Sequence, residues 1–314
     1  MHRGLIVKST GKFYNIRNSE TNELVQGIIR GKFKLQGLRL TNPVAVGDFV
    51  GYEMEDDLAV IKKIEERQNY VVRQSPRNKH NLHFLASNVD QVLLVVTIRE
   101  PNLKQGFIDR FLLMTEPYNI PVIIVFNKSD LFEDGDKRVV EYLRNIYEPL
   151  NYQVFTSSAL SGQGLDDIRN VLDTKTTLIA GQSGVGKSSL LNLLFPYLEL
   201  RTKQISNYSG KGQHTTTFAE MFEVDKKTMI IDTPGIKTLS FNHLEVMDVA
   251  HNFRELFIIS EQCKYRDCTH RNEPKCAVKE GLETGEVSEL RYSNYVKILD
   301  ELENQNYWER ITDY

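Results

Sequence analysis

The order of two short segments constrains the fold of this chain more than any other feature of its sequence. The later segment, Gly181–Ser188, reads G-x-x-x-x-G-K-S and lies between the apolar run 176–180 and a helix-like stretch, which is the context of a phosphate-binding loop. The earlier segment, Asn127–Asp130, reads N-K-S-D and follows the apolar run 122–126. In an ordinary GTPase the phosphate loop comes first. The reversed order therefore predicts a circularly permuted nucleotide-binding sheet, which is possible where chain ends lie close together.

The phosphate loop supplies the groups that a triphosphate needs. Its glycines let backbone N–H groups turn toward the phosphates, and the following helix N-terminus adds partial positive charge. We expect Lys187 to bridge β- and γ-phosphate oxygens in catalysis and Ser188 to bind Mg²⁺. The predicted phosphate-binding residues are Gly181, Gln182, Ser183, Gly184, Val185, Gly186, Lys187, Ser188 and Ser189. A glycine-rich turn without function is the alternative, which the flanking strand and helix disfavour.

The earlier segment provides the groups that would read a base. Asn127, Lys128 and Asp130 are the predicted contacts. An aspartate can accept two hydrogen bonds from the guanine N1–H and exocyclic amine, whereas adenine would leave that carboxylate unpaired. Ser158 and Ala159, after the predicted strand 153–156, are expected to buttress the base. N-K-S-D alone is a weak signal, so the prediction depends on its combination with the phosphate loop.

Two further segments are expected to surround the terminal phosphate. In Asp232-Thr233-Pro234-Gly235, Asp232 should hold Mg²⁺ through water and the Gly235 N–H should contact the γ-phosphate. The same four residues would also suit a plain turn. The next residue is Ile236, where Ras-like GTPases use a glutamine to orient the attacking water. Isoleucine cannot do this, so either another group orients the water or the intrinsic rate is very low.

The polar stretch 206–217 is where the first switch loop belongs. Thr216 is the favoured Mg²⁺ ligand, with Thr215 as the near alternative. His214 is the candidate for orienting water, and packing or capping is its alternative role.

The spacing of apolar residues predicts a multidomain α/β protein. Residues 1–70 contain short strands broken by Gly, Asn and Asp, which indicates an OB-like β-barrel. Residues 71–242 alternate buried strands with helices, which predicts a doubly wound sheet, here a circularly permuted P-loop GTPase core. Residues 243–314 are predicted to form a helical zinc-binding domain whose polar faces explain an excess of acidic residues.

All three cysteines lie in one short segment near the C-terminal end, together with a histidine. They form the pattern Cys263-x₄-Cys268-x-His270-x₅-Cys276. Three thiolates and one imidazole suit a closed, tetrahedral, structural Zn²⁺ site, and an odd cysteine count argues against disulfides. Five bases surround the pattern, and either a phosphate contact or a solubilising rim would explain them. These bases are Lys264, Arg266, Arg271, Lys275 and Lys279.

The net charge of −3 conceals a basic beginning. Residues 1–40 hold eight Lys or Arg residues and only two Glu residues, which fits either a polyanionic partner or an ordinary solvated surface. No apolar run approaches the ~18 residues of a membrane span, and the first residues lack a signal-peptide layout. We therefore expect a cytoplasmic protein without a membrane partner.

In this combination and order, the motifs resemble those of the ribosome small-subunit-dependent GTPase A family (RsgA, also called YjeQ or YloQ). The resemblance covers essentially the whole chain. It implies a bacterial GTPase that binds the small (30S) ribosomal subunit, acts late in its maturation and hydrolyses GTP weakly until that subunit stimulates it. It also implies that the barrel contacts rRNA, that the zinc is structural and that His214 is a proposed catalytic residue.

Two other functions stay open on the residues alone. A P-loop ATPase or small-molecule kinase is disfavoured by Asn127–Asp130, and a comparison of GDP with ADP binding would decide. A non-enzymatic, nucleotide-gated RNA-binding module is suggested by Ile236, and a turnover assay would decide. We expect a monomer, because both flanking modules already have a large partner to bind.

Overall fold

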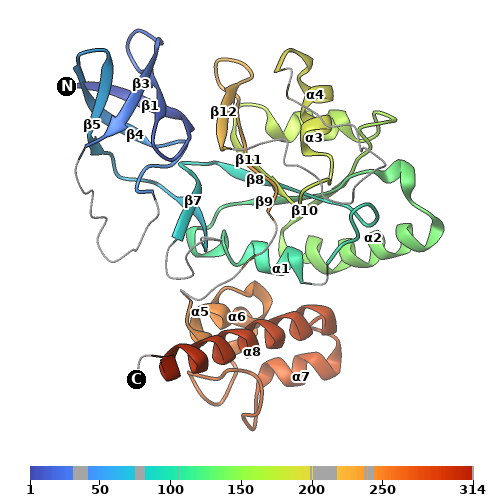
Figure 1. The fold of residues 1–314 in the computed structure, drawn as a ribbon. Coiled ribbons are helices and arrows are strands. Elements are labelled where there is room, and N and C mark those ends of the chain that lie inside the picture. Colours follow the sequence, from blue (N-terminus) through green and yellow to red (C-terminus); the bar gives the residue numbers. More distant parts are fainter. Residues whose placement is uncertain are drawn as a thin grey trace.

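The computed structural model of the protein describes residues 1–30, 42–74, 82–104, 106–198, 200, 218–236, 239 and 244–312. Within these ranges no helix is both long and apolar enough to cross a membrane. The fold has three parts, which Figure 1 shows as a barrel, an α/β core and a helical C-terminal unit comprising residues 244–312.

The barrel is a closed sheet of short strands. The strands are β1 (His2–Ser9), β2 (Tyr14–Asn18), β3 (Leu24–Ile29), β4 (Phe49–Glu55) and β5 (Leu58–Ile64). They pair in the order β1-β2-β3-β5-β4, and β4 returns to pair with β1. Alternate residues face inward because successive strand side chains point to opposite faces, and Ile6, Ile16 and Tyr52 fill the interior. The predicted barrel is confirmed.

The α/β core is a doubly wound sheet, as predicted. Its strands are β8 (Gln91–Val96), β9 (Val122–Phe126), β10 (Gln153–Thr156), β11 (Thr176–Gly181), β12 (Glu220–Glu223) and β13 (Met229–Asp232). The order is β10-β9-β8-β11-β13-β12, and only β12 runs antiparallel to its neighbour in this part of the sheet. Strands β8 and β9 are buried at every position, because helices cover both faces.

Four helices cover the two faces of this sheet. They are α1 (Phe107–Leu112), α2 (Asp134–Tyr147), α3 (Leu165–Leu172) and α4 (Lys187–Leu194). Figure 1 shows α1 and α2 on the side of the C-terminal unit, with α3 and α4 on the other side. Successive β8 residues confirm the two layers: Leu94 packs with the α1 and α2 side chains, whereas Leu93 packs with those of α3 and α4. Short 3₁₀ turns complete the core: η1 (Glu116–Tyr118), η2 (Ser129–Leu131), η3 (Glu148–Leu150) and η4 (Pro196–Leu198).

The barrel joins the core in two places. Strand β1 pairs with β12, so that barrel and core form one continuous sheet of eleven strands. The sequence did not predict this pairing. Nor did it predict a separate two-stranded ribbon of β6 (Tyr70–Gln74) and β7 (Leu82–Ser87), which precedes β8.

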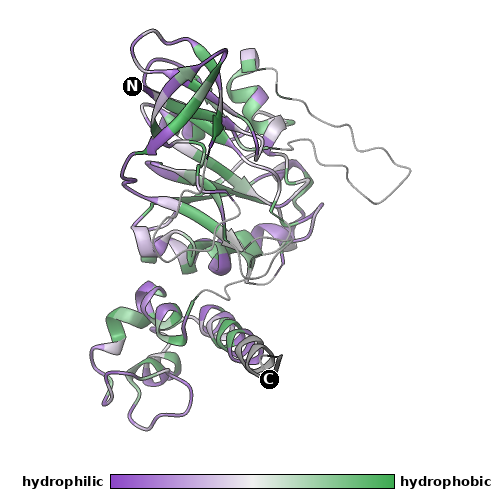
Figure 2. Ribbon diagram, turned by 60° about the vertical axis from the view of Figure 1, so that its left-hand side comes forward, coloured by the Kyte–Doolittle hydropathy of each residue, from purple (hydrophilic) through white to green (hydrophobic). Residues whose placement is uncertain are grey.

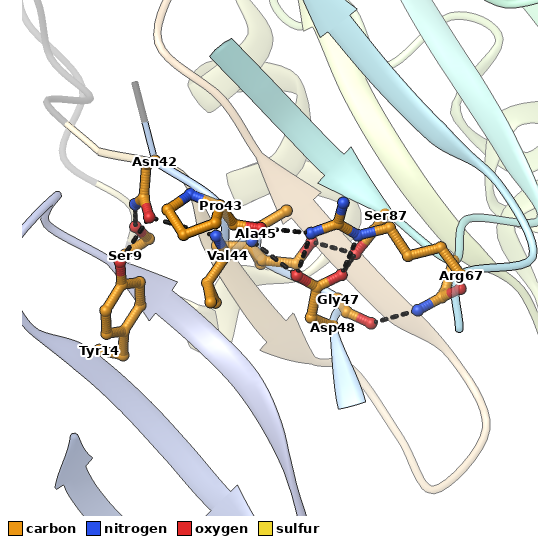
Figure 3. A network of polar contacts seen from close by, with 12 residues as sticks. Ser9, Tyr14, Asn42, Pro43, Val44, Ala45, Gly47, Asp48, Arg67 and Ser87 are labelled. Carbon is orange, nitrogen blue, oxygen red and sulfur yellow. Dashed lines mark hydrogen bonds and ion pairs between the residues drawn. The ribbon is translucent and has the colours of Figure 1, made fainter. Parts of the chain in front are cut away.

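The second junction is a buried polar cluster around Asp48, which Figure 3 shows from close by. The Asp48 carboxylate accepts hydrogen bonds from Arg67 Nε at 2.7 Å, Ser87 Oγ at 2.6 Å and the Ala45 N–H at 2.8 Å. Gly47 permits the close approach, because a Cβ there would lie 2.1 Å from the Ser87 carbonyl oxygen. The cluster fixes the start of β4 against the end of β7.

The C-terminal unit is helical. Its helices are α5 (Val246–His251), α6 (Arg254–Ser260), α7 (Ala277–Thr284) and α8 (Glu289–Thr312). Figure 2 shows this unit on the far side of the core from the barrel. Its apolar side chains, including Leu256, Val278 and Leu299, belong to the same buried cluster as those of α1 and α2.

Candidate functional site

The predicted phosphate loop joins β11 to α4, as its sequence indicated. Gly181 ends β11 with a φ of +146°, and a Cβ there would lie 2.1 Å from the Val95 carbonyl oxygen. Gly186 has a φ of +91°, and a Cβ there would lie 2.5 Å from the Asn127 side-chain nitrogen. Only glycine fits such conformations and approaches without strain. The loop is therefore in contact with the base-reading segment.

Lys187 projects into this loop from the first turn of α4. Its Nζ donates hydrogen bonds to the Gly181 and Gln182 carbonyl oxygens, each at 3.1 Å. Burial lowers the pKa of Lys187, while the nearby Asp232 carboxylate acts in the opposite direction. An ammonium group among turned-in backbone groups suits a phosphate chain. Ser188 and Ser189 follow it in the same turn and are half-buried.

The segment Asp232–Gly235 packs directly against the phosphate loop. Thr233 Oγ1 donates to the Ile179 carbonyl at 2.9 Å, and the Ile236 N–H donates to the Gly181 carbonyl at 3.0 Å. A Cβ at Gly235 would lie 2.7 Å from Ser183 Cα. Ile236 is fully buried in the main apolar cluster. Its side chain therefore packs into the apolar core and holds the segment Asp232–Gly235 in place.

The base-reading segment is held by side chains from three loops. Asn127 is fully buried, donates from Nδ2 to the Val185 carbonyl at 2.9 Å and accepts a hydrogen bond from Ser157 Oγ at 3.0 Å. Ser158 Oγ donates to the exposed Asp130 carboxylate. The N–H groups of Leu160 and Ser161 donate to Ser158 Oγ at 3.1 and 3.0 Å. The carboxylate is thereby fixed at the rim of the site.

Lys128 makes a contact that the sequence did not predict. Its Nζ donates to the backbone carbonyl of Glu100, in the loop that follows β8. Burial lowers the pKa of Lys128, and the Glu100 and Asp130 carboxylates oppose this effect. The neighbouring Pro101 also borders the phosphate loop, since its Cδ lies 3.7 Å from where a Gly184 Cβ would be. No motif signals this loop, because it contributes backbone and ring atoms to the site.

The structure brings the predicted phosphate, base and Asp232 segments together at the ends of β9, β11 and β13. Of the buttress residues, Ser158 is buried and Ala159 is half-buried. The predicted switch residues His214, Thr215 and Thr216 lie outside the described residues. Their roles stay predictions.

The second candidate site is a cluster of sulfur and nitrogen ligands. The ligand atoms of Cys263, Cys268, His270 and Cys276 all lie within 4.8 Å of one another. The Cys263 and Cys276 sulfurs are 4.0 Å apart, and they lie 3.7 and 3.5 Å from His270 Nδ1. Ligands around tetrahedral Zn²⁺ are about 3.5–3.8 Å apart, because Zn–S is about 2.3 Å and Zn–N about 2.0 Å. The donor set and its spacing therefore fit a metal ion.

Residues 261–276, which we call the cysteine loop, are held in place by hydrogen bonds within the loop and from α8. Burial alone would raise the pKa of Glu273, but hydrogen bonds from the Thr269 side chain and nearby backbone N–H groups lower it to about 2. From α8, Tyr292 and Tyr295 donate hydroxyl hydrogen bonds at 2.8 Å to the carbonyls of His270 and Thr269. The loop is thus attached to the helical core of the unit as well as to its own ligands.

Some of the basic residues form ion pairs with glutamates, whereas others do not. In the barrel, Arg3, Lys8, Arg17 and Arg30 each form an ion pair with a glutamate of the same chain. Such pairing favours an ordinary surface at these four positions. Lys32, Lys34 and Arg39 lie outside the described residues.

The bases around the cysteine loop differ in their partners. Arg271 pairs with Glu303 at 2.7 Å. By contrast, three further bases are exposed and form no ion pair within the described part of the chain: Lys264, Arg266 and Lys275.

Comparison with known proteins gives a consistent result. The RsgA GTPase family model matches residues 64–242, and the RsgA N-terminal domain model matches residues 3–61. A curated relative from Phocaeicola vulgatus, "Small ribosomal subunit biogenesis GTPase RsgA", is 44% identical over 306 residues, covering 97% of this chain and 98% of the relative. A relative of the same name from Flavobacterium psychrophilum is 41% identical over 95% of this chain and 92% of its own length.

Solved structures agree with the sequence comparison. The crystal structure of YjeQ from Thermotoga maritima superposes with a TM-score of 0.74 at 36% identity, covering 96% of this chain and 98% of that one. YloQ, described as a circularly permuted GTPase, superposes with a TM-score of 0.70 at 31% identity, covering 97% of this chain and 96% of that one. The predicted permutation of the α/β core is confirmed.

Proposed function

Because the chain belongs to the RsgA GTPase family, we propose that it hydrolyses GTP while bound to the small (30S) ribosomal subunit and its rRNA, and that it assists late maturation of that subunit. The observation that carries the nucleotide part is the hydrogen bond from Asn127 to Val185, which couples base recognition to the phosphate loop. The ribosomal part rests on the relatives, which are named small ribosomal subunit biogenesis GTPases and match almost the full chain. We keep the division into domains 1–70, 71–242 and 243–314.

In this proposal each described residue has a defined task. Asp130, oriented by Ser158, accepts hydrogen bonds from guanine. The N–H groups of residues 182–189 and the Lys187 ammonium hold the phosphates. Ser188 and Asp232 would hold the Mg²⁺ ion, with Thr216 proposed to join them. The ion would neutralise charge that develops on the phosphate oxygens.

The residue that follows Gly235 does not supply the water-orienting group. Ile236 is buried and has no polar atom in its side chain, so it cannot direct water toward the γ-phosphate. His214, in the switch segment, is the proposed replacement. His214→Ala should therefore lower stimulated GTP turnover much more than GTP affinity, and equal turnover in the variant and the parent would remove this role.

The cysteine loop is proposed to bind one structural zinc ion. Four protein ligands leave no open coordination position, so the ion would stabilise the loop without taking part in hydrolysis. The exposed Lys264, Arg266 and Lys275 are available for phosphate contacts. We place the protein in the cytoplasm and expect a monomer.

The deciding experiment is a GTP turnover assay with and without purified 30S subunits. We expect slow release of phosphate from the protein alone and a strong increase when subunits are added. No increase at any subunit concentration would favour a nucleotide-gated binding module. Tighter binding of ADP than of GDP would favour the ATPase or kinase alternative.

Base recognition can be tested separately. Asp130→Asn should shift the preference from GTP toward XTP, because an asparagine amide complements the xanthine carbonyl that replaces the guanine amine. An unchanged GTP affinity would mean that Asn127–Asp130 does not read the base.

A further inference from the structure

A buried ion cluster connects the C-terminal unit to helix α1 of the core. Arg291, in α8, is 1% exposed, as is Asp109 in α1. The Arg291 guanidinium donates to Asp109 Oδ1 at 2.7 Å and to both carboxylate oxygens of Glu255, in α6, at 2.7 Å. Tyr147 OH also donates to Asp109 Oδ1 at 2.7 Å. The cluster thus links the cysteine-bearing unit to one particular helix of the core.

A second contact reaches the beginning of that helix. Asn294, one turn along α8, donates from Nδ2 to Asp109 Oδ2 at 2.6 Å. Its Oδ1 would lie 3.3 Å from a Cβ placed on Gly106, the residue that precedes α1 with a φ of +75°. Arg291 and Asn294 therefore fix both the first turn of α1 and the point where the preceding loop enters it.

That preceding loop, residues 97–104 with Gly106, leads to the nucleotide site. We call it the β8–α1 loop. Its Glu100 carbonyl accepts a hydrogen bond from Lys128, and the Pro101 ring lies 3.7 Å from where a Cβ on Gly184 of the phosphate loop would be. Thr97 Oγ1 holds the loop by donating to the Pro101 carbonyl at 2.7 Å.

The β8–α1 loop is also attached to the core on its other side. Arg99 forms ion pairs with Glu133 and Asp136 at the beginning of α2, each at 2.6 Å. The loop is therefore fixed to the beginning of α2, leads into α1, and contacts Lys128 through its Glu100 carbonyl. A shift of α1 would be transmitted to Glu100 and Pro101, because packed elements move as units.

From these contacts we infer that the C-terminal unit controls how tightly the core retains guanine nucleotide, acting through Asp109 and the β8–α1 loop. Arg291 and Asn294 are positioning residues: they contact no nucleotide, but they keep the Glu100 carbonyl on Lys128 and Pro101 against Gly184. A partner that binds the C-terminal unit and shifts it relative to α1 would thereby change the rate of nucleotide dissociation. The contacts named above do not include the segment 232–236, which would sense the γ-phosphate, so the route should act on GDP as well as on GTP. The inference rests on the guanine-nucleotide binding proposed above.

The test is a double-mutant cycle read out by the rate of GDP dissociation from the full-length protein. Asn294→Ala releases the start of α1 but leaves the Arg291–Asp109 ion pair in place. Thr97→Val frees the Pro101 carbonyl with little change of side-chain shape. Each substitution should speed GDP dissociation about three- to tenfold, the range expected for residues that modulate coupling between sites. Since both act through one loop, the double variant should be faster by less than the product of the two factors.

The matched control is Glu301→Gln. Glu301 forms an ion pair with Arg110 that joins the same two helices, at 2.5 Å, but its side chain is 53% exposed and it does not contact Asp109. This variant should release GDP at the parent rate. Thermal unfolding and metal content are measured for all variants to confirm that each remains folded.

The outcomes distinguish failure of the coupling route from failure of the proposed guanine-nucleotide binding. Equal dissociation rates for the parent and Asn294→Ala, equal acceleration by Asn294→Ala and Glu301→Gln, or fully multiplicative effects of Asn294→Ala and Thr97→Val would each refute the coupling route. A parent protein that fails to prefer GDP over ADP would instead refute the proposed nucleotide specificity.

Discussion

The barrel and the C-terminal unit both pack against the GTPase core, but different contacts hold them. Where the barrel meets β12, the junction consists of strand pairing and two partly exposed ion pairs, Lys8–Glu220 and Arg17–Glu223. The C-terminal unit is held to α1 by the fully buried Arg291–Asp109 pair. Exposed ion pairs contribute little to stability, whereas a broken buried pair leaves a charge without solvent or partner. The difference predicts an adjustable junction at β12 and a rigid one at α1.

The largest effect should follow loss of the metal from the C-terminal unit. Cys276→Ser removes one of the four proposed ligands, and a chelator removes the proposed ion, whose binding free energy in small zinc domains is about 10 kcal/mol or more. We expect the cysteine loop and the helices packed on it to lose structure. Circular dichroism with metal analysis measures this, and GDP binding shows whether the core survives. Unchanged thermal stability of the metal-free protein would show that the helical packing alone maintains the unit.

Breaking the buried pair should be the next largest effect. Arg291→Met leaves Asp109 and Glu255 buried without their shared cation, which should cost about 3–5 kcal/mol. Denaturant unfolding measures it. The exposed pair between the same helices provides the comparison, since Glu301→Gln should cost under about 1 kcal/mol. Similar costs for the two variants would mean that burial does not distinguish the contacts.

The barrel also has a buried ion pair, Arg67–Asp48, which can be compared with the Arg291–Asp109 pair of the C-terminal unit. Arg67→Met removes the cation from the buried Asp48 carboxylate, which keeps hydrogen bonds from Ser87 and Ala45. We expect a loss of about 2–4 kcal/mol. Ser87→Ala, which removes a neutral donor from the same carboxylate, should cost about 1–2 kcal/mol. If the order of these two costs is reversed, the ion pair is not the main contact of this junction.

The smallest effect is expected at β12. Glu220→Gln and Glu223→Gln together should cost about 0–1 kcal/mol per pair at low salt, and the cost should shrink further at high salt. Unfolding measured at two ionic strengths provides the test. A large, salt-independent loss would show that the junction at β12 is as rigid as the one at α1.

The sequence predicted what depends on local pattern. Alternation in strands such as Tyr14–Asn18, and continuous apolar runs such as Val122–Phe126, gave the barrel and the doubly wound sheet. The phosphate and base-reading segments could be predicted because their chemistry requires fixed residue types at fixed spacing. The cysteine pattern predicted, for the same reason, a cluster of side chains that the structure brings together.

Contacts between distant residues were not predictable in this way. Arg291 and Asp109 are 182 positions apart, and each reads as an ordinary surface charge on an amphipathic helix. The basic residues at the beginning likewise looked unopposed, because their partners Glu65, Glu220 and Glu223 lie far along the chain. The sequence did not predict the contacts of the β8–α1 loop, because the loop contributes mainly backbone atoms to them.

The pairing of β1 with β12 also closes part of a sheet edge through which copies of the chain could associate. An open sheet edge offers a row of unpaired N–H and C=O groups, which recruits other chains into mixed sheets. Strand β12 would be such an edge in an isolated GTPase core, and β1 pairs with it at Lys8 and Glu220. We therefore expect the barrel to limit self-association of the enzyme part of the chain. A core expressed without it is expected to self-associate through β12, whatever its nucleotide content.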